Sequence, residues 1–316
     1  MPKNIESLIN TGIHFSIADK AGTQDPRKNI VVCGVARSGT SLVAGALFKL
    51  GVFMGNTANP PVYEDVTFSR AMEEDDVDAA RRIIADYDDK YPIWGWKRPS
   101  SVNFLDVVDG IFPNPVYVFI FKDIFSIAKR NRISMHSDLI SNMRNAYRQL
   151  GKILNFIEKR NPTAMMVSYE KALMNRQHFV QSMCDFIGIQ VSEDQFKAAV
   201  NFIRPNPADY LDLSRITKAR GVLGKITETS VAGWARAVYN EVPIKVELYV
   251  NDRQVAVTSA DIFRKDILEK GIHPTGHVGF LFTREDDHKL KKGDVVRVRA
   301  ENEINDLNNC PQVFEG

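Results

Sequence analysis

A short segment rich in small and hydroxylic residues, Gly-Val-Ala-Arg-Ser-Gly-Thr-Ser at positions 34–41, carries the clearest chemistry in this sequence. Glycine at position 39 permits a tight turn in which backbone N–H groups converge, and a helix that follows it would add a partial positive charge. Arg37 adds a cation, and hydroxyl groups come from Ser38, Thr40 and Ser41. The segment therefore predicts a binding site for a phosphate or a similar anion.

This loop departs from a strict P-loop at one position. A P-loop reads G-x-x-x-x-G-K-[ST], and its lysine reaches the terminal phosphates while its hydroxyl holds Mg²⁺. Here the spacing is kept, but Thr40 stands at the lysine position and the cation lies three residues earlier, at Arg37. A turn between a strand and a helix that binds no ligand is the alternative interpretation.

The segment from Arg37 to Ser41 resembles the 5′-phosphosulfate loop of the PAPS-dependent sulfotransferase family, which is a basic residue followed by S-G-T-[ST]. The resemblance implies that Arg37 neutralises the phosphosulfate of the donor and that the loop binds it through Ser38, Gly39, Thr40 and Ser41. PAPS would then be the donor and PAP the product. No metal is expected, because a backbone cradle, a cation and hydroxyl donors suffice to stabilise the departing phosphate.

A second basic segment, Lys122-Asp-Ile through Arg130, follows a predicted strand at 116–121. In the family this strand ends in R-D-P, and a serine eight residues after the arginine joins it in binding the 3′-phosphate of PAPS. This sequence has Lys122 for the arginine, Ile124 for the proline and Arg130 for the serine. Lysine and arginine both bind phosphate, so the resemblance implies this role for Lys122 and Arg130. A solvated basic surface is the competing interpretation.

Two further residues are candidates for the reaction itself. The segment Trp94-Gly-Trp-Lys-Arg-Pro99 resembles the W-G-W-K-x-P of many bacterial members, which implies that Lys97 lies near the leaving side of the donor; packing between aromatic rings is the alternative. Transfer to an alcohol also needs a group that takes its proton. None of the six histidines has a convincing context, whereas Glu64 resembles the catalytic glutamate of carbohydrate sulfotransferases. Glu64 is therefore the predicted general base, unless it is only an acid at a helix start.

The elements that must position these residues alternate between strands and helices. Continuous apolar runs predict buried strands at 29–34, 116–121 and 164–168. Helical periodicity predicts helices at 42–50, 139–157, 177–187 and 193–203. Such alternation favours an α/β fold with a P-loop-like parallel sheet covered by helices on both faces. We predict this domain at 29–215, after an N-terminal extension at 1–28.

The pattern changes to strands alone after the predicted join at 213–221. Alternation at 244–250 and 254–258 predicts a hairpin, and runs at 278–282 and 295–300 look like another pair. Residues 220–316 are thus expected to form a small all-β, sandwich-like accessory domain. Its G-W-A, A-D…R-x-D and G-F segments resemble a β module appended to bacterial enzymes that build surface polysaccharides, which implies a carbohydrate acceptor. Trp234 is expected in the core of the sandwich, with stacking on a sugar as the alternative.

Composition sets the outer limits of these predictions. The 316 residues are 44% hydrophobic and 25% charged, as in ordinary folded proteins, and a net charge of +2 gives no case for nucleic acid as a partner. Three scattered cysteines suit a reducing compartment and offer no disulfide framework or metal spacing. We find neither a signal-peptide pattern nor an apolar run of the ~20 residues that span a bilayer. A cytoplasmic location is expected, and the oligomeric state is left open.

Together the motifs predict an enzyme that moves a sulfuryl group from PAPS to a hydroxyl of a carbohydrate, such as a surface polysaccharide or a glycolipid. A P-loop kinase or other phosphotransferase is one alternative, and Thr40 at the lysine position argues against it. A non-catalytic glycan-binding protein with a degenerate nucleotide fold is the other. The substitutions at 122, 124 and 130 leave that alternative open.

Overall fold

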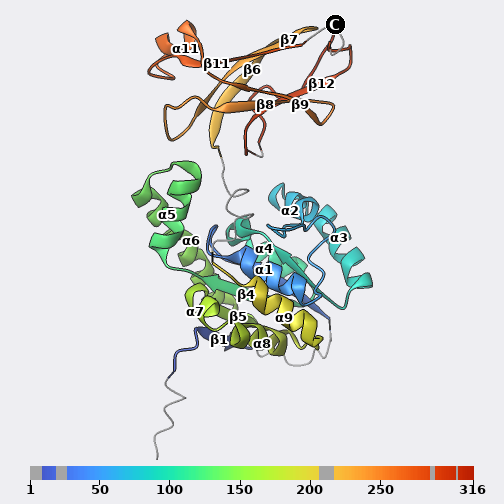
Figure 1. Cartoon of the computed structure of the whole chain (residues 1–316). Coiled ribbons are helices and arrows are strands. Elements are labelled where there is room, and N and C mark those ends of the chain that lie inside the picture. Colours follow the sequence, from blue (N-terminus) through green and yellow to red (C-terminus); the bar gives the residue numbers. More distant parts are fainter. Residues whose placement is uncertain (1–8, 19–26, 206–216, 285–288, 304) are drawn as a thin grey trace, which may run out of the picture. The chain divides into compact units, whose positions relative to one another are not determined.

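The computed structural model describes residues 9–18, 27–205, 217–284, 289–303 and 305–316 (Figure 1). The chain divides into two compact units, of which the first comprises Met1–Arg130 and Leu139–Tyr210 and the second Asn131–Asp138 and Leu211–Gly316. The end of the predicted first domain at 215 and the start of the predicted join at 213–221 lie outside the described residues, as do parts of the N-terminal extension.

The first unit is built on one sheet, which contains five strands among the residues described. In spatial order these are β1 (Ile13–Ser16), β5 (Ala164–Ser168), β4 (Pro115–Phe121), β2 (Lys28–Cys33) and β3 (Ile93–Lys97). Strands β2 to β5 are parallel, and β1 pairs antiparallel with β5. The sequence did not predict β1 or β3, because both are short and lack a continuous apolar run.

Helices cover both faces of this sheet, as the alternation of elements predicts (Figure 1). Ile30 and Val32 of β2 pack on one face, against α1 (Thr40–Lys49), α7 (Tyr169–Met174), α8 (Arg176–Ile187) and α9 (Glu193–Phe202). Val31 and Cys33 pack on the other, against α2 (Val66–Glu73), α3 (Val77–Lys90), α4 (Leu105–Ile111), α5 (Ile124–Met135) and α6 (Leu139–Arg160). The two-residue period of a strand divides the apolar residues between the two cores.

Strand β2 marks the point where the chain changes direction across the sheet. It lies between β3 and β4, so the chain passes from β2 to one neighbour and then crosses back to the other. In open α/β sheets, ligands bind beyond the carboxyl ends of the strands at such a switch point. The candidate cations lie at these ends: Arg37 follows β2, Lys97 ends β3 and Lys122 follows β4.

The second unit contains two antiparallel four-stranded sheets among its described residues, which agrees with the predicted all-β domain. One has the order β10 (Ile262–Phe263), β11 (His277–Thr283), β7 (Ser230–Ala237), β6 (Ala219–Thr227). The other has the order β13 (Gln312–Val313), β12 (Val295–Ala300), β8 (Lys245–Val250), β9 (Arg253–Ser259). A short helix, α11 (Lys265–Glu269), lies between β10 and β11. Side chains from both sheets form one core, including Leu223, Phe280, Leu248 and Val298.

Two sequence predictions about this unit were wrong. The runs at 278–282 and 295–300 do not pair with each other: β11 pairs with β7 and β10, while β12 pairs with β8 and β13, because the chain changes sheets between them.

The second wrong prediction concerns Trp234, which is not in the core. The alternation in β7 turns Gly233 and Ala235 inward and leaves Trp234 half-buried on the outer face. A side chain at Gly233 would meet the Phe280 ring at 2.5 Å, so that ring takes the inner space.

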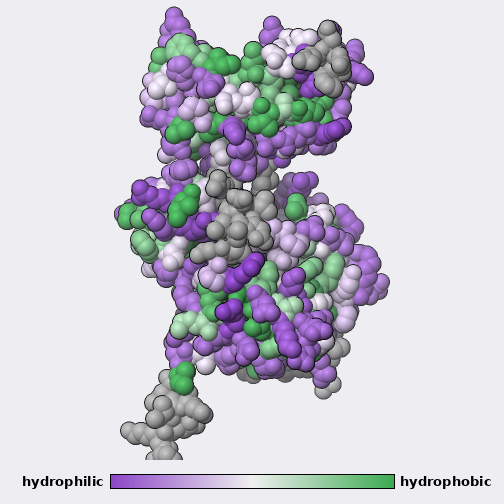
Figure 2. Space-filling view, in the orientation of Figure 1, coloured by the Kyte–Doolittle hydropathy of each residue, from purple (hydrophilic) through white to green (hydrophobic). Residues whose placement is uncertain are grey.

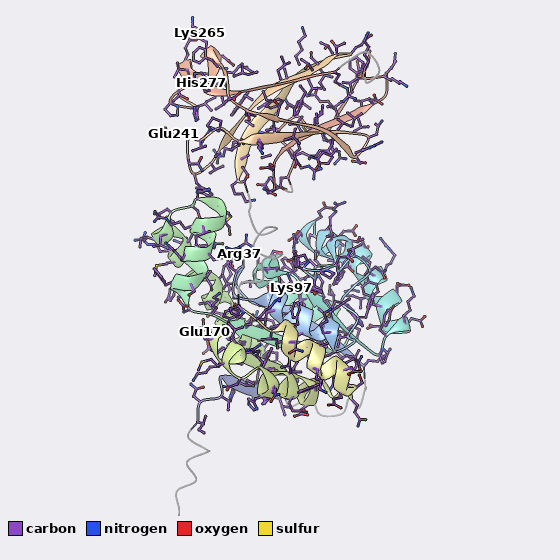
Figure 3. The ribbon with its side chains drawn as sticks, in the orientation of Figure 1. Arg37, Lys97, Glu170, Glu241, Lys265 and His277 are labelled. Carbon is purple, nitrogen blue, oxygen red and sulfur yellow. The ribbon has the colours of Figure 1, made fainter. Side chains whose placement is uncertain are left out.

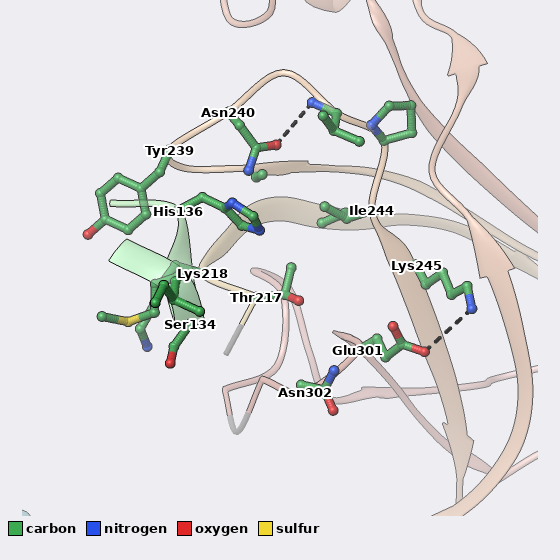
Figure 4. A pocket seen from close by; sticks show the side chains of 15 residues that line it. Ser134, His136, Thr217, Lys218, Tyr239, Asn240, Ile244, Lys245, Glu301 and Asn302 are labelled. Atoms are coloured by element: carbon green, nitrogen blue, oxygen red, sulfur yellow. Dashed lines mark hydrogen bonds and ion pairs between the residues drawn. The ribbon is translucent and has the colours of Figure 1, made fainter. Parts of the chain in front are cut away.

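Apolar side chains also reach the surface of the second unit, where Figure 2 shows them among polar ones. The exposed large ones among its described residues from 217 onward are Tyr239, Val242, Val255, Val257, Ile262, Phe263, Leu268, Leu281 and Val313. The segment that leads into β8 is held by polar contacts drawn in Figure 4. There the Asn240 side chain accepts a hydrogen bond from the Val242 amide at 3.0 Å, and Lys245 lies 3.7 Å from Glu301.

Candidate functional site

The loop between β2 and α1 has the geometry of an anion cradle. Gly39 is the N-cap of α1 with φ 105°, and its own side chain offers no capping group. The first N–H groups of a helix lack intrahelical acceptors, so an uncapped N-terminus can donate to an anion. Ser38 is fully buried, and its hydroxyl oxygen has no hydrogen-bond partner among the residues that the structure describes. A buried hydroxyl without a partner is costly, which fits a polar ligand atom in this cradle.

An aromatic ring joins this loop to the end of β4. The Tyr169 ring packs so closely on Gly39 that a Cβ there would lie 2.4 Å from ring atom Cδ2. Lys122 lies on the same ring, with its ammonium 4.0 Å from the ring centroid. Burial lowers the pKa of Lys122, partly opposed by Glu170 and Asp123, and the charge of nearby Arg130 lowers it further. Lys122 and Arg130 thus form a second basic group at the same edge of the sheet.

Lys97 is the most deeply placed cation of the site. Its side chain is 1% exposed, and its ammonium donates to Ser41 Oγ at 3.1 Å and to Glu64 Oε1 at 2.6 Å. Burial lowers the pKa of Lys97; Glu64 opposes this effect, whereas Arg98 and Arg37 add to it. Arg37 therefore lies within electrostatic range of Lys97 (Figure 3). The structure brings together the loop, Lys97 and Glu64, which are far apart in the sequence.

Glu64 and its neighbour Asp65 have separate tasks. Asp65 is the N-cap of α2 and accepts hydrogen bonds from the amides of Thr67 and Phe68 and from the hydroxyls of Thr57 and Tyr87. Glu64 precedes the helix, is 15% exposed and turns toward Lys97. Asp65 thus supplies the helix-start acid, and Glu64 remains available for the site.

Sequence reasoning did not single out Arg98 and Glu73. Arg98 Nη1 donates to Glu64 Oε2, and the rest of its guanidinium forms two bonds of 2.8 Å with the Glu73 carboxylate. Ser100 also donates to Glu73. Burial raises the pKa of Glu73, but the Arg98 and Ser100 contacts outweigh it and the net direction is downward. The only available signal was an arginine next to the candidate lysine in the W-G-W-K-R-P segment.

The Tyr169–Glu170 pair holds two turns of the site in place. Glu170 accepts a hydrogen bond from the Asp123 amide at 3.3 Å, directly before α5, and one from the Ser168 hydroxyl at 3.4 Å. Asp123 in turn accepts from the Ser126 amide at 2.8 Å within the first turn of α5. The two carboxylates therefore bind backbone and hydroxyl groups at helix starts. Among the residues that the structure describes, no group of three or more metal-ligating side chains occurs.

The last residue of β2, Cys33, provides a stability test of the buried strand beside the loop. Burial raises the pKa of its thiol to about 12 from 9.0, partly opposed by Ser101 and the Gly34 amide. The unfolded chain thus loses this proton first as pH rises, and stability falls above pH 9. We expect the free energy of unfolding to drop by about 1.4 kcal/mol more between pH 8 and pH 10 in the wild type than in Cys33→Ala, measured by urea titration. Equal drops would contradict this buried position.

No protein-family model matches the chain, and no curated protein matches it. Similar solved structures include the sulfotransferase domain of the Synechococcus PCC 7002 olefin synthase, at 14% identity and TM-score 0.41 over 59% of this chain and 84% of that one. Sulfotransferase STF9 from Mycobacterium avium matches at 9% identity and TM-score 0.44, over 58% and 69%. Sulfotransferase STF1 from Mycobacterium tuberculosis matches at 13% identity and TM-score 0.42, over 60% and 75%.

None of the described helices is long and apolar enough to cross a lipid bilayer.

Proposed function

We propose that the first unit transfers a sulfuryl group from PAPS to a hydroxyl group of a carbohydrate. The observation that carries this proposal is the contact of buried Lys97 with both the phosphate loop, at Ser41, and the acid Glu64. Thr40 stands at the position of the P-loop lysine, so the loop itself lacks that cation. Lys97, at the end of the neighbouring strand β3, supplies a cation instead. In the proposed reaction this cation would stabilise the charge that develops on the phosphate as the bond to sulfur breaks.

Each residue has a defined part in this reaction. Arg37, Ser38, Gly39, Thr40 and Ser41 would hold the 5′-phosphosulfate, with Arg37 as the neutralising cation. Glu64 would take the proton of the acceptor hydroxyl while the acceptor oxygen forms its bond to sulfur. The bond between sulfur and the phosphate oxygen breaks at the same time, and its electron pair stays on that oxygen, next to Lys97. PAP and the sulfated acceptor are the products.

The other end of the donor would bind at the carboxyl end of β4. Lys122 and Arg130 are close enough to influence each other, and the Tyr169 ring links Lys122 to Gly39. Two cations at this place suit the 3′-phosphate. The carbohydrate acceptor rests on the sequence pattern of the second unit, together with half-buried Trp234 on the outer face of β7. A cytoplasmic location belongs to the same proposal.

A kinase would need a metal site near the loop. Asp123 is the acid that follows β4, and its carboxylate accepts from the Ser126 amide at the start of α5. Its own amide is held by Glu170. This arrangement favours a structural task for Asp123 over a metal ligand, and it supports sulfuryl over phosphoryl transfer.

Calorimetry with PAP, without added Mg²⁺, tests the donor site. We expect the wild type to bind PAP and Arg37→Ala to bind it roughly 10- to 100-fold more weakly, because a hydrogen bond to a charged group contributes about 1.5–3 kcal/mol. The control is Arg70→Ala, on the exposed surface of α2, which should bind like the wild type. Binding of ATP with Mg²⁺ but not of PAP would replace the sulfotransferase with a kinase.

A further inference from the structure

A continuous row of polar and charged groups runs from the phosphate loop to α2. Ser41 contacts Lys97, Lys97 contacts Glu64, Glu64 contacts Arg98, and Arg98 contacts Glu73. Charges alternate along this row, so each carboxylate neutralises a cation. Within this row Glu64 binds two cations through different oxygens, Oε1 toward Lys97 and Oε2 toward Arg98.

The two cations on Glu64 are held very differently. Lys97 is a single buried ammonium that contacts a hydroxyl of the phosphate loop, so an anion in the cradle would compete directly with Glu64 for it. Arg98 is fixed from the opposite side by two bonds of 2.8 Å to Glu73, and its exposed fraction is 23%. A bidentate arginine–carboxylate pair has a defined geometry that a single ammonium lacks. One contact is therefore exchangeable, and the other is fixed.

We propose that Arg98, held by Glu73, is the positioning residue for Glu64: it keeps the carboxylate in place when Lys97 turns to the donor. This inference rests on the proposed function and extends it to a specific order of events. Donor binding draws Lys97 toward the phosphosulfate, which frees Oε1 of Glu64 to accept a proton. Oε2 stays on Arg98, so the freed oxygen keeps its direction. Glu64 is thus a competent base only after the donor has bound.

The requirement for arginine follows from the geometry. One planar guanidinium presents Nε and Nη2 to Glu73 and Nη1 to Glu64 at the same time. A lysine at this position could supply the charge but not the two-sided fork. Ser100 donates to the Glu73 carboxylate as well, which fixes the far end of the row. The charged groups that face Glu64 are Lys97 and Arg98; Arg37 acts on Lys97, and Glu73 acts on Arg98.

The inference is tested with PAPS and water, so no acceptor has to be known. Water then attacks sulfur, Glu64 takes its proton, and PAP and sulfate are released. We would measure PAP affinity, and kcat and KM for this hydrolysis, in the wild type, Arg98→Ala, Arg98→Lys and Glu73→Gln. Controls are Arg70→Ala and Glu74→Gln, which change exposed charges on and next to α2.

We expect Arg98→Ala to keep PAP affinity within about twofold and to lose on the order of 10- to 100-fold in kcat, the size of one positioning hydrogen bond to a charged group. Arg98→Lys keeps a cation at this position but cannot form the two-sided fork, so it should restore kcat only in part. Glu73→Gln removes the charge that holds Arg98 from the far side, so kcat should fall by less than in Arg98→Ala, again with PAP affinity retained.

The decisive result is a fall in kcat in Arg98→Ala with unchanged PAP affinity and unchanged KM for PAPS, together with partial rescue by Arg98→Lys. An unchanged kcat in Arg98→Ala, or full rescue by Arg98→Lys, would overturn the positioning role of Arg98. So would loss of PAP affinity in Arg98→Ala equal to that in Arg37→Ala, since Arg98 would then belong to the donor site. Failure of the wild type to bind PAP at all would instead refute the proposed function.

Discussion

Replacement of Lys97 by methionine is expected to abolish most sulfuryl transfer while leaving the protein folded. The ammonium is 1% exposed, and burial lowers its pKa, so removal of the charge relieves a desolvation cost. Methionine fills a similar volume, and Glu64 keeps its contact with Arg98. The transition state loses the cation beside the departing phosphate oxygen, so we expect PAPS hydrolysis to fall by on the order of 10²- to 10³-fold.

The measurement is the rate of PAP release together with a thermal unfolding curve. Lys90→Met serves as the control, because Lys90 is an exposed residue of α3 that pairs with Asp86, four positions earlier on the same helix. Its activity should equal that of the wild type. A Lys97→Met protein that unfolds at the wild-type temperature and retains full activity would remove Lys97 from the reaction.

A single added methyl group at Gly39 is expected to eliminate donor binding and to destabilise the first unit. With φ 105°, this residue has a backbone conformation that L-residues other than glycine rarely adopt, which costs on the order of 1–3 kcal/mol. The methyl carbon would also meet the Tyr169 ring at 2.4 Å. The ring would have to move, and Lys122, whose ammonium lies against it, would move as well.

Gly39→Ala should therefore lower the urea midpoint and abolish PAP binding together. Gly151→Ala is the matched control: Gly151 lies within α6, and outside the backbone of its own helix no described atom lies within 4 Å of an added Cβ. This control should be neutral or stabilising by up to about 1 kcal/mol, since alanine favours helix. Gly39→Ala with normal stability and normal PAP affinity would contradict the close packing of Tyr169 on the loop.

The sequence predicted the parts of the fold that local patterns determine. Strand β2, its glycine turn and helix α1 form one contiguous signal, and the long helix α6 shows a clear 3.6-residue period. Strand β1 gives no such signal, since its four residues are stabilised by pairing with β5, about 150 positions later. The pairing of β11 and β12 failed for the same reason: strand partners in a sandwich are chosen by non-local packing.

The candidate site also has a part that local sequence predicts and a part that it does not. The residues of the phosphate loop are adjacent in the sequence, so they lie together in any fold. Glu64 and Lys97 were chosen separately from resemblance, and their 2.6 Å contact is a consequence of where α2 and β3 meet. Arg98 and Glu73 were not predicted, because an arginine after a motif and a glutamate within a helix look like ordinary surface residues. Only the bidentate contact between Arg98 and Glu73 in the folded protein connects these two residues to the site.

The three tryptophans of the chain are divided unequally between the two units. Trp94 and Trp96 are fully buried among aromatic rings of the first core, whereas Trp234 is half-buried on the outer face of β7. Their fluorescence therefore has a shielded component from the first unit and a component from the second that solvent quenchers reach more easily. A Trp234→Phe protein would emit from the first unit alone, and Trp96 is the residue directly before Lys97. Occupancy of the site would then be visible as a change in emission, with no label attached to the protein.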